Sequence, residues 1–224
     1  MKAIHPTKTC FLSAGIGEWY ATGTDRLKGT LLDKGFDGDL LIWRNEWPSN
    51  NFPRDVVYNV KPDAVQTAMD RGYTTIIWGD ASITARKNTA PFTQHIREHG
   101  YWIGQSGHRA SQTCTDAQLQ YFGVSRDWAH EVTDCATGLF GFDISRPEMR
   151  KIVEEWIKAG REGAFRGSRL RGNGSHDRRF LYGRQDQAAM SLILGKHGLP
   201  LRHCIEFFRF RWDKQDTIFH CEGM

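Results

Sequence analysis

Residues 74–82 hold the side chains best placed for chemistry in this chain. Residues 74–78 are mostly β-branched and apolar, which predicts a buried strand, and Asp80 follows directly after it. Ser82 stands two residues further on, so the two side chains face the same way if the backbone stays extended. Ligands of open α/β sheets collect beyond the carboxyl ends of the strands. A carboxylate there predicts a divalent cation bound together with phosphate oxygens.

Strand and helix signals alternate along the chain, which is typical of a mostly parallel sheet with helices on both faces. Glycines that follow helical segments, such as Gly72 and Gly160, indicate where those helices stop. We expect an α/β fold with one Rossmann-like domain spanning residues 1–224. The expected strands are 9–14, 39–43, 74–78, 101–104, 136–144 and 205–212, and the expected helices are 25–34, 62–71, 91–99, 115–122, 147–159 and 185–197.

The composition is that of a soluble globular protein. The chain has 224 residues, of which 39% are apolar and 25% are charged. No apolar run approaches the roughly 20 residues of a membrane span, and we expect neither a signal peptide nor a membrane partner. The five cysteines are odd in number and form no Cys-x-x-Cys pair, which favours a reducing, cytoplasmic location.

Residues 161–184 make the protein basic. Seven arginines in this segment give it a net charge of +5, while the remaining residues sum to −1. The segment also holds five glycines, which predicts a mobile loop. Three interpretations stay open: a lid that closes over a diphosphate, a surface for a nucleic-acid backbone, and a solvated insert.

Four motifs, in this order, resemble those of the GT-A-fold glycosyltransferases, including glycogenin-like retaining members. They are Lys61-Pro62 with the segment 72–82, the small-residue strand 135–143, the helix start Arg184-Gln-Asp186-Gln187, and His220-Cys-Glu-Gly223. The resemblance covers most of the chain. Ser82 departs from the family pattern, because many members carry a second aspartate there.

The resemblance implies a metal site. It makes Asp80 a ligand of Mn²⁺ or Mg²⁺ that bridges the donor diphosphate, with Ser82 as a weak ligand or a contact to the ribose. It makes His220 a third metal ligand. The alternatives are an aspartate and a serine that belong to an ordinary turn, and a histidine that lies in solvent.

The resemblance also implies donor-binding and catalytic residues. Small residues at the end of the first strand would admit a nucleoside, and basic residues would contact the phosphates or the sugar; these donor-binding residues are Ser13, Ala14, Gly15, Lys61 and Arg184. Asp186 and Gln187 would hold the transferred sugar or stabilise a developing positive charge. An acid at a helix N-terminus also favours the helix itself, so a structural role stays open for Asp186.

The resulting prediction is a metal-dependent glycosyltransferase that uses a nucleotide sugar, UDP-linked by family default, and tends towards retention of configuration. The acceptor would be a hydroxyl of a saccharide, of a protein, or of a hydroxymethylated DNA base. Two rival classes stay open. One is a non-catalytic nucleic-acid-binding module that uses the arginine segment, and the other is a metal-dependent phosphohydrolase that uses Asp80, Asp186 and His220.

Overall fold

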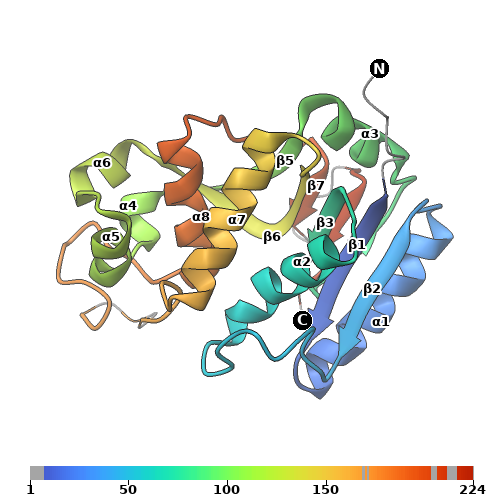
Figure 1. The fold of residues 1–224 in the computed structure, drawn as a ribbon, viewed down its shortest axis with the longest axis horizontal. Helices are drawn as coiled ribbons and strands as arrows, with labels where there is room; N and C mark the ends of the chain where they lie inside the picture. Colours follow the sequence, from blue (N-terminus) through green and yellow to red (C-terminus); the bar gives the residue numbers. More distant parts are fainter. Residues whose placement is uncertain (1–7, 168–169, 171, 203–205, 211–215, 224) are drawn as a thin grey trace.

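A twisted five-stranded sheet forms the centre of the fold (Figure 1). The computed structural model describes residues 8–167, 170, 172–202, 206–210 and 216–223. The strand order is β2-β1-β3-β6-β5. The strands span Asp39–Arg44 (β2), Thr9–Gly15 (β1), Thr75–Gly79 (β3), Thr133–Asp143 (β6) and Tyr101–Arg109 (β5).

Four of these five strands run in one direction and β6 runs against them. β1 pairs in parallel with both β2 and β3, whereas β6 pairs antiparallel with β3 on one side and with β5 on the other. The mostly parallel α/β sheet predicted from the sequence is therefore confirmed. The reversal at β6 matters for the site, because it brings the middle of β6 to the edge where β3 ends.

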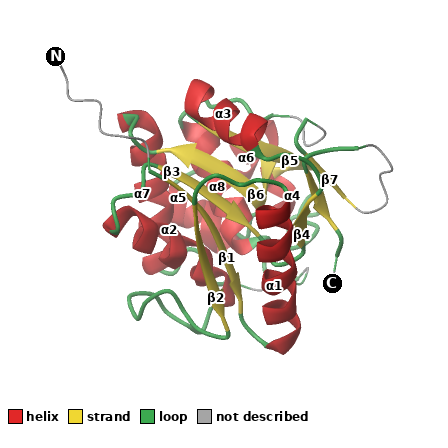
Figure 2. Ribbon diagram, turned by 90° about the vertical axis from the view of Figure 1, so that its right-hand side faces the viewer, coloured by secondary structure: helices red, strands yellow, loops and turns green. Residues whose placement is uncertain are grey.

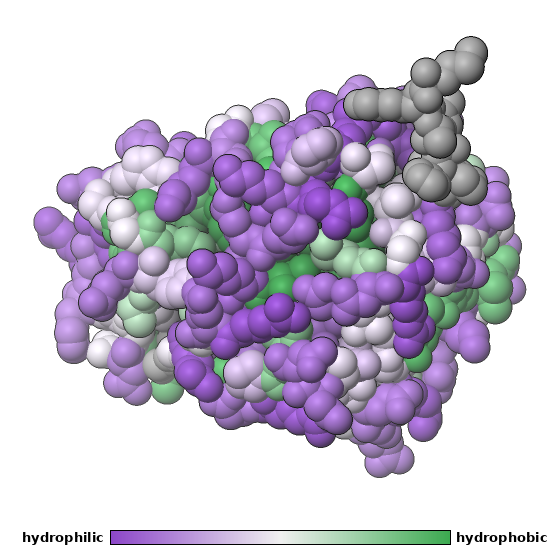
Figure 3. Space-filling view, viewed as in Figure 1, coloured by the Kyte–Doolittle hydropathy of each residue, from purple (hydrophilic) through white to green (hydrophobic). Residues whose placement is uncertain are grey.

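Helices α2 (Val60–Asp70), α7 (Pro147–Arg161) and α8 (Gln185–Lys196) cover one face of the sheet. Helix α7 buries Met149, Ile152, Val153, Trp156 and Ile157 at the spacing of a single helical face, as predicted. Its opposite side belongs to a molecular surface that is mostly hydrophilic (Figure 3). Helix α8 differs, because every residue from Asp186 to Leu194 is buried.

Helices α1 (Glu18–Asp33) and α3 (Ala90–His99) belong to the other face, and Figure 2 shows α1 and α2 on opposite sides of the sheet. A second sheet joins them, with the order β4-β8-β7. Its strands are β4 (Ile83–Ala85), β8 (Phe219–Cys221) and β7 (Phe208–Phe210). In this second core Phe219 of β8 contacts both Phe11 of β1 and Phe92 of α3.

Short helices α4 (Ala110–Thr113), α5 (Asp116–Phe122) and α6 (Arg126–Glu131) lie at the end of the molecule beyond β5 and β6 (Figure 1). A 3₁₀ turn, η1 (Val57–Asn59), leads into α2. The side chains of Thr115 and Ser125 cap α5 and α6 by accepting hydrogen bonds from backbone N–H groups. Within the described residues, no helix is both long enough and apolar enough to cross a membrane.

The structure differs from the sequence prediction in several places. Helix α1 begins at Glu18 rather than at residue 25, and β5 is nine residues long. β4 and β8 were not predicted, because three-residue strands carry almost no sequence signal; the predicted strand 205–212 lies partly outside the described residues and contains β7. In the described part of the arginine segment, Phe165 and Phe180 are fully buried.

Candidate active site

Asp80 lies where β3 meets β6. The buried strand β3 ends at Gly79, and the backbone N–H of Asp80 donates a hydrogen bond to the carbonyl of Gly138, 2.8 Å away, in the antiparallel strand β6. The indole Nε1 of Trp78 donates to Asp80 Oδ1 at 2.7 Å. Two neighbouring elements therefore hold the carboxylate in place.

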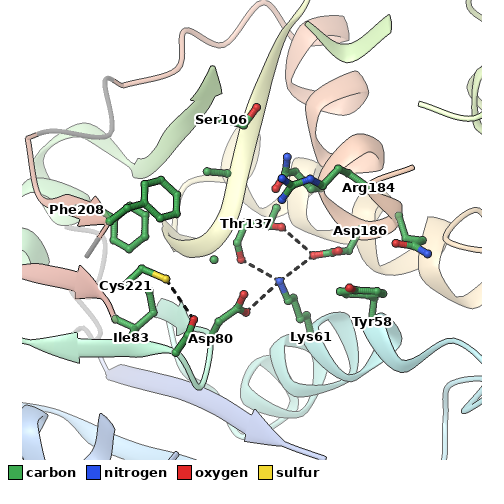
Figure 4. A pocket seen from close by; sticks show the side chains of 16 residues that line it. Tyr58, Lys61, Asp80, Ile83, Ser106, Thr137, Arg184, Asp186, Phe208 and Cys221 are labelled. Carbon is green, nitrogen blue, oxygen red and sulfur yellow. Dashed lines mark hydrogen bonds and ion pairs between the residues drawn. The ribbon is translucent and has the colours of Figure 1, made fainter. Parts of the chain in front are cut away.

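Lys61, in the first turn of α2, lies between two carboxylates (Figure 4). Its Nζ is 3.0 Å from Asp80 Oδ1 and 3.0 Å from Asp186 Oδ2, and it donates a hydrogen bond to the carbonyl of Thr137 at 3.1 Å. Burial alone lowers the pKa of Lys61, but the charges of Asp186 and Asp80 outweigh burial and raise that pKa above its ordinary value. The lysine is therefore a charged, fully engaged ammonium.

The two carboxylates differ in their access to solvent. The Asp186 side chain is 5% exposed and accepts a further hydrogen bond from Thr137 Oγ1 at 2.8 Å, whereas the Asp80 side chain is 37% exposed. Burial and the negative charge of Asp186 raise the pKa of Asp80, while Lys61 and Trp78 lower it, and the net direction is upward. Two acids that share one lysine leave this cluster with a net charge of −1 when both are ionised.

Two neighbouring cavities meet at this cluster and share Tyr58, Lys61, Asp80 and Ser82 in their linings. The larger, of about 390 Å³, lies between the start of α8 and the small sheet. The smaller, of about 280 Å³, lies beside the end of β1 and includes Ala14 and Tyr20. Figure 4 shows Ile83, Phe208 and Cys221 on the opposite side of the larger cavity from Lys61 and Asp186. One wall of that cavity is thus charged and the other is mostly apolar.

Comparison with known proteins identifies the fold. No protein-family model matches the chain, and no curated protein matches it in sequence. Solved structures match it over nearly its whole length. A glycosyltransferase involved in glycosylation of the major capsid of the virus PBCV-1 matches with a TM-score of 0.53 at 9% identity, over 97% of this chain and 94% of that one.

Mouse xyloside xylosyltransferase 1 matches with a TM-score of 0.51 at 9% identity, over 97% of this chain and 98% of that one. The galactosyltransferase LgtC, solved with donor and acceptor sugar analogues, matches with a TM-score of 0.50 at 10% identity, over 95% and 86% of the two chains. The chain has a GT-A glycosyltransferase fold. At these identities the likeness establishes the fold, and the chemistry has to come from the residues of the site.

Within the GT-A fold, the predicted nucleoside edge at the end of β1 is partly in reach of a ligand. Ala14 lines the smaller cavity. Ser13 is fully buried, and its Oγ has no hydrogen-bond partner among the described residues. At Gly15 a Cβ atom would come within 2.4 Å of the carbonyl oxygen of Tyr20, so this glycine lets the start of α1 approach the strand end.

Arg184, Asp186 and Gln187 all line the larger cavity at the start of α8. Arg184 Nη2 donates to the hydroxyl of Tyr182 at 3.1 Å, and its guanidinium lies 4.9 Å from the centroid of that ring. The same hydroxyl is 2.7 Å from His108 Nε2. A chain of contacts from β5 therefore supports Arg184 at the cavity.

The structure does not bring His220 together with Asp80 and Ser82. His220 Nδ1 lies 3.2 Å from Glu222 Oε1, and that carboxylate also pairs with Arg86. Its neighbour Cys221 lines the larger cavity instead, with Sγ 3.5 Å from Ser82 Oγ. This placement follows from pairing with β4, since successive side chains of a strand point to opposite sides.

These positions bear on the predicted Mn²⁺ or Mg²⁺ site. Asp80 Oδ1 is already engaged by Lys61 and Trp78, and no cluster of three or more His, Cys, Asp or Glu residues suited to a metal occurs in the described part of the chain. The described residues therefore do not fit the three-ligand site. The metal role of Asp80, Ser82 and His220 stays a prediction from the resemblance.

Sequence reasoning missed several residues around the cavities. Thr137 contacts both Lys61 and Asp186, Tyr58 borders both cavities, and Asp134 is a fully buried acid next to Gln187. Thr137 and Asp134 sit in β6, where a threonine or an aspartate carries no signal of its contacts with distant elements. Asp134 lies two residues before the predicted strand 136–144, so the sequence carried no hint that this acid is buried.

Proposed function

We propose that this protein transfers a sugar from a nucleotide-sugar donor to an acceptor hydroxyl. The observation that carries the proposal is the Lys61–Asp80–Asp186 cluster at the meeting point of two cavities in a GT-A fold. A nucleotide sugar consists of a nucleoside and a sugar joined by a diphosphate. Two cavities that meet at shared residues match this division, with one cavity for each part. We assign the activity to the cytoplasm, in keeping with the cysteine content.

In this proposal the nucleoside, with uridine as the first candidate, occupies the smaller cavity beside Ala14 and Tyr20. The diphosphate lies at the shared residues, close to Lys61 and Ser82. The sugar enters the larger cavity, where Asp80 and Asp186 accept hydrogen bonds from its hydroxyl groups. Carboxylates are strong acceptors for such groups, and their fixed geometry favours one orientation of the ring.

Transfer breaks the bond between the anomeric carbon and the diphosphate, so negative charge grows on the leaving diphosphate. Arg184 and Lys61 are the cations that line the larger cavity within the described residues, and their charges favour that departure. We propose retention of configuration, as the resemblance implies. No step is assigned to Mn²⁺ or Mg²⁺, because the described residues do not form the predicted ligand set.

A saccharide or protein hydroxyl is the acceptor that the cavity supports best. Phe208 and Phe210 form part of an apolar wall, which suits the flat apolar face of a sugar ring or an aromatic group. The arginine segment offers less free charge than its composition implied. Arg166 pairs with Asp55, and Arg179 pairs with Asp177 and Asp127. A modified DNA base is therefore a second choice.

The test is a panel of nucleotide sugars with and without Mn²⁺ or Mg²⁺, read by thermal shift and by release of free nucleotide. A donor that binds the folded state raises the melting temperature by mass action. We expect Asp80→Ala to abolish nucleotide release, whereas Asp25→Ala, which alters an exposed acid on α1, leaves it unchanged. An equal rate of release by the wild type and Asp80→Ala would contradict the proposal.

The same preparation tests the rival nucleic-acid-binding module. That rival predicts binding to DNA or RNA that falls steeply with salt, and no shift with any nucleotide sugar. If a donor raises the melting temperature and DNA binding is absent at physiological salt, the module is excluded. If the reverse holds, the glycosyltransferase proposal fails.

A further inference from the structure

Asp134, near the start of β6, is a fully buried acid that accepts four hydrogen bonds. None of its partners is charged, and no ion pair to it occurs among the described residues. Burial raises the pKa of Asp134, and the four hydrogen bonds act in the opposite direction. Burial of a carboxylate without a cationic partner costs stability, which the hydrogen bonds to Asp134 only partly offset.

The hydrogen-bond partners of the two Asp134 carboxylate oxygens lie in different parts of the protein. Oδ2 accepts from Ser106 Oγ at 2.6 Å and from Gln187 Nε2 at 2.6 Å, and both of these residues line the larger cavity. Oδ1 accepts from Thr113 Oγ1 at 3.0 Å and from Ser191 Oγ at 2.7 Å, and neither lines it. One oxygen thus serves the cavity wall and the other serves the protein interior.

The hydrogen bond to Asp134 fixes the orientation of the Gln187 side-chain amide. An ionised carboxylate can only accept, so the amide must turn its NH₂ group towards Asp134. The carbonyl oxygen Oε1 of Gln187 then points away from Asp134. Without Asp134 the amide could turn over and present a donor where the native protein presents an acceptor. Ser191 Oγ also lies 2.8 Å from the backbone carbonyl oxygen of Gln187, so its single hydroxyl proton is shared between that carbonyl and Asp134.

We propose that Asp134 is a positioning residue that holds the Gln187 amide with its carbonyl oxygen towards the larger cavity, where it accepts a hydrogen bond from a hydroxyl of the transferred sugar. The inference rests on the proposed function for the identity of the ligand. The orientation of the amide does not depend on it. Asp134 itself does not line the cavity and acts through Gln187 and Ser106.

Three variants distinguish a positioning role of Asp134 from a purely structural one. Asp134→Leu removes both sets of contacts. Asp134→Asn can keep its carbonyl towards Gln187 while its NH₂ group donates to Thr113 and Ser191, whose hydroxyls can rotate to accept. Thr113→Val is the matched control, because it removes a hydrogen bond to the interior oxygen of the same carboxylate and leaves the cavity side intact.

We expect kcat per folded molecule to fall about 100-fold in Asp134→Leu, as is usual when a contact group near the reacting centre is misplaced. Binding of the free nucleoside diphosphate should stay unchanged, because that part of the donor does not reach Gln187. Asp134→Asn should recover most of the kcat, and Thr113→Val should lower stability with kcat unchanged. If kcat per folded molecule is equal in all three variants and the wild type, the positioning role is excluded.

A spectroscopic readout covers the case in which Asp134→Leu fails to fold. The side-chain amide of Gln187 should give a ¹H–¹⁵N signal that is protected from exchange in the wild type and in Thr113→Val. In Asp134→Asn its chemical shift should move, because the charged acceptor is replaced by a neutral one. An unchanged, exchange-labile signal in all three proteins would overturn the proposal. This measurement needs no substrate, so failure of the proposed function and failure of the positioning role are distinguishable.

Discussion

Two buried acids, Asp186 and Asp134, lie near the larger cavity, and they are stabilised in different ways. Asp186 shares the ammonium of Lys61 with Asp80, whereas Asp134 is held by hydroxyl and amide donors alone. A charged partner makes the loss of either member costly, since the remaining charge is left buried. A set of neutral donors instead fixes the direction of each polar group around the acid. The first arrangement concentrates charge at the cavity, and the second orients the groups that face the ligand.

The largest effect should come from breaking the charged arrangement with Lys61→Met. We expect a loss of about 3–5 kcal/mol in the free energy of unfolding, because two carboxylates then face each other without a cation. Transfer should be lost as well. Urea denaturation measures the first effect. The double variant Lys61→Met/Asp186→Asn should recover part of the stability, and Lys158→Met, on the exposed side of α7, should change little.

A stability loss in Lys61→Met no larger than in Lys158→Met would remove the distinction between the two acids. It would mean that the ion pairs with Asp80 and Asp186 contribute no more than a surface contact does.

Helix α1 offers a second way to disturb the charged arrangement while leaving Asp134 alone. A Cβ atom at Gly23 would lie 2.4 Å from the carbonyl oxygen of Ala81, next to Asp80, whereas a Cβ at Gly29 meets nothing within 4 Å. We expect Gly23→Ala to cost about 1–3 kcal/mol through overpacking. Gly29→Ala should stabilise the protein by up to about 1 kcal/mol, as alanine normally does in a helix.

Thermal denaturation of both variants, together with donor binding, checks this prediction. We expect the melting temperature to fall in Gly23→Ala and to rise in Gly29→Ala. Equal stabilisation at both would show that the loop containing Ala81 can move without cost.

The dependence of activity on pH should reflect the ionisation of Asp80. Its pKa is raised, mainly by burial, so the carboxyl group protonates above the value of about 3.9 that is usual for aspartate. Activity, which uses the anion, should fall up to tenfold per pH unit below that raised pKa. Stability should respond in the opposite sense: because the folded state takes up this proton more readily than the unfolded state, ionisation of Asp80 disfavours folding as the pH rises through its pKa.

Rate measurements from pH 4 to 8 on the wild type and Asp80→Asn test the assignment. The acidic decline should be absent from any residual activity of Asp80→Asn. A decline at the same pH in both proteins would assign it to another group.

The smallest effects should come from the arginine segment. Arg184→Met should lower kcat/KM for the donor about tenfold, the equivalent of one charge-assisted contact, because Arg184 lines the larger cavity and its charge favours departure of the diphosphate. Arg166→Ala, at an exposed ion pair with Asp55, should change neither kcat/KM nor the stability measurably. Steady-state kinetics of the two variants check the contrast, and an equal loss in both would favour a lid formed by the whole segment.

Local sequence patterns predicted the elements that hold the site. The apolar face of α7 and the β-branched run of β3 were both identified, and with them the strand end at Asp80 and the helix start at Asp186. These patterns work because periodicity reports which side of an element is buried. The family resemblance, and not these local patterns, predicted that Lys61, Asp80 and Asp186 belong to one site.

Contacts between distant segments could not be predicted in the same way. Nothing local in the sequence indicates that Asp134 meets Gln187, or that Ile83–Ala85 pairs with Phe219–Cys221, since both depend on which elements become neighbours in space. The arginine segment gives another example. Its glycines and charges predict a mobile loop, and nothing local in them indicates that Phe165 and Phe180 within it are fully buried.

The pairing of β4 with β8 has a consequence for how the protein is made. Residues 83–85 follow directly after Asp80 and Ser82, yet their partner strand is synthesised more than 130 residues later. The large sheet, whose strands all lie between Thr9 and Asp143, can therefore form while one wall of the cavity is still missing. Contacts between segments so far apart form slowly, and a nascent chain keeps this edge uncovered until residues 219–221 have been synthesised. The complete cavity, and with it ligand binding, therefore depends on a strand pairing that forms late in folding.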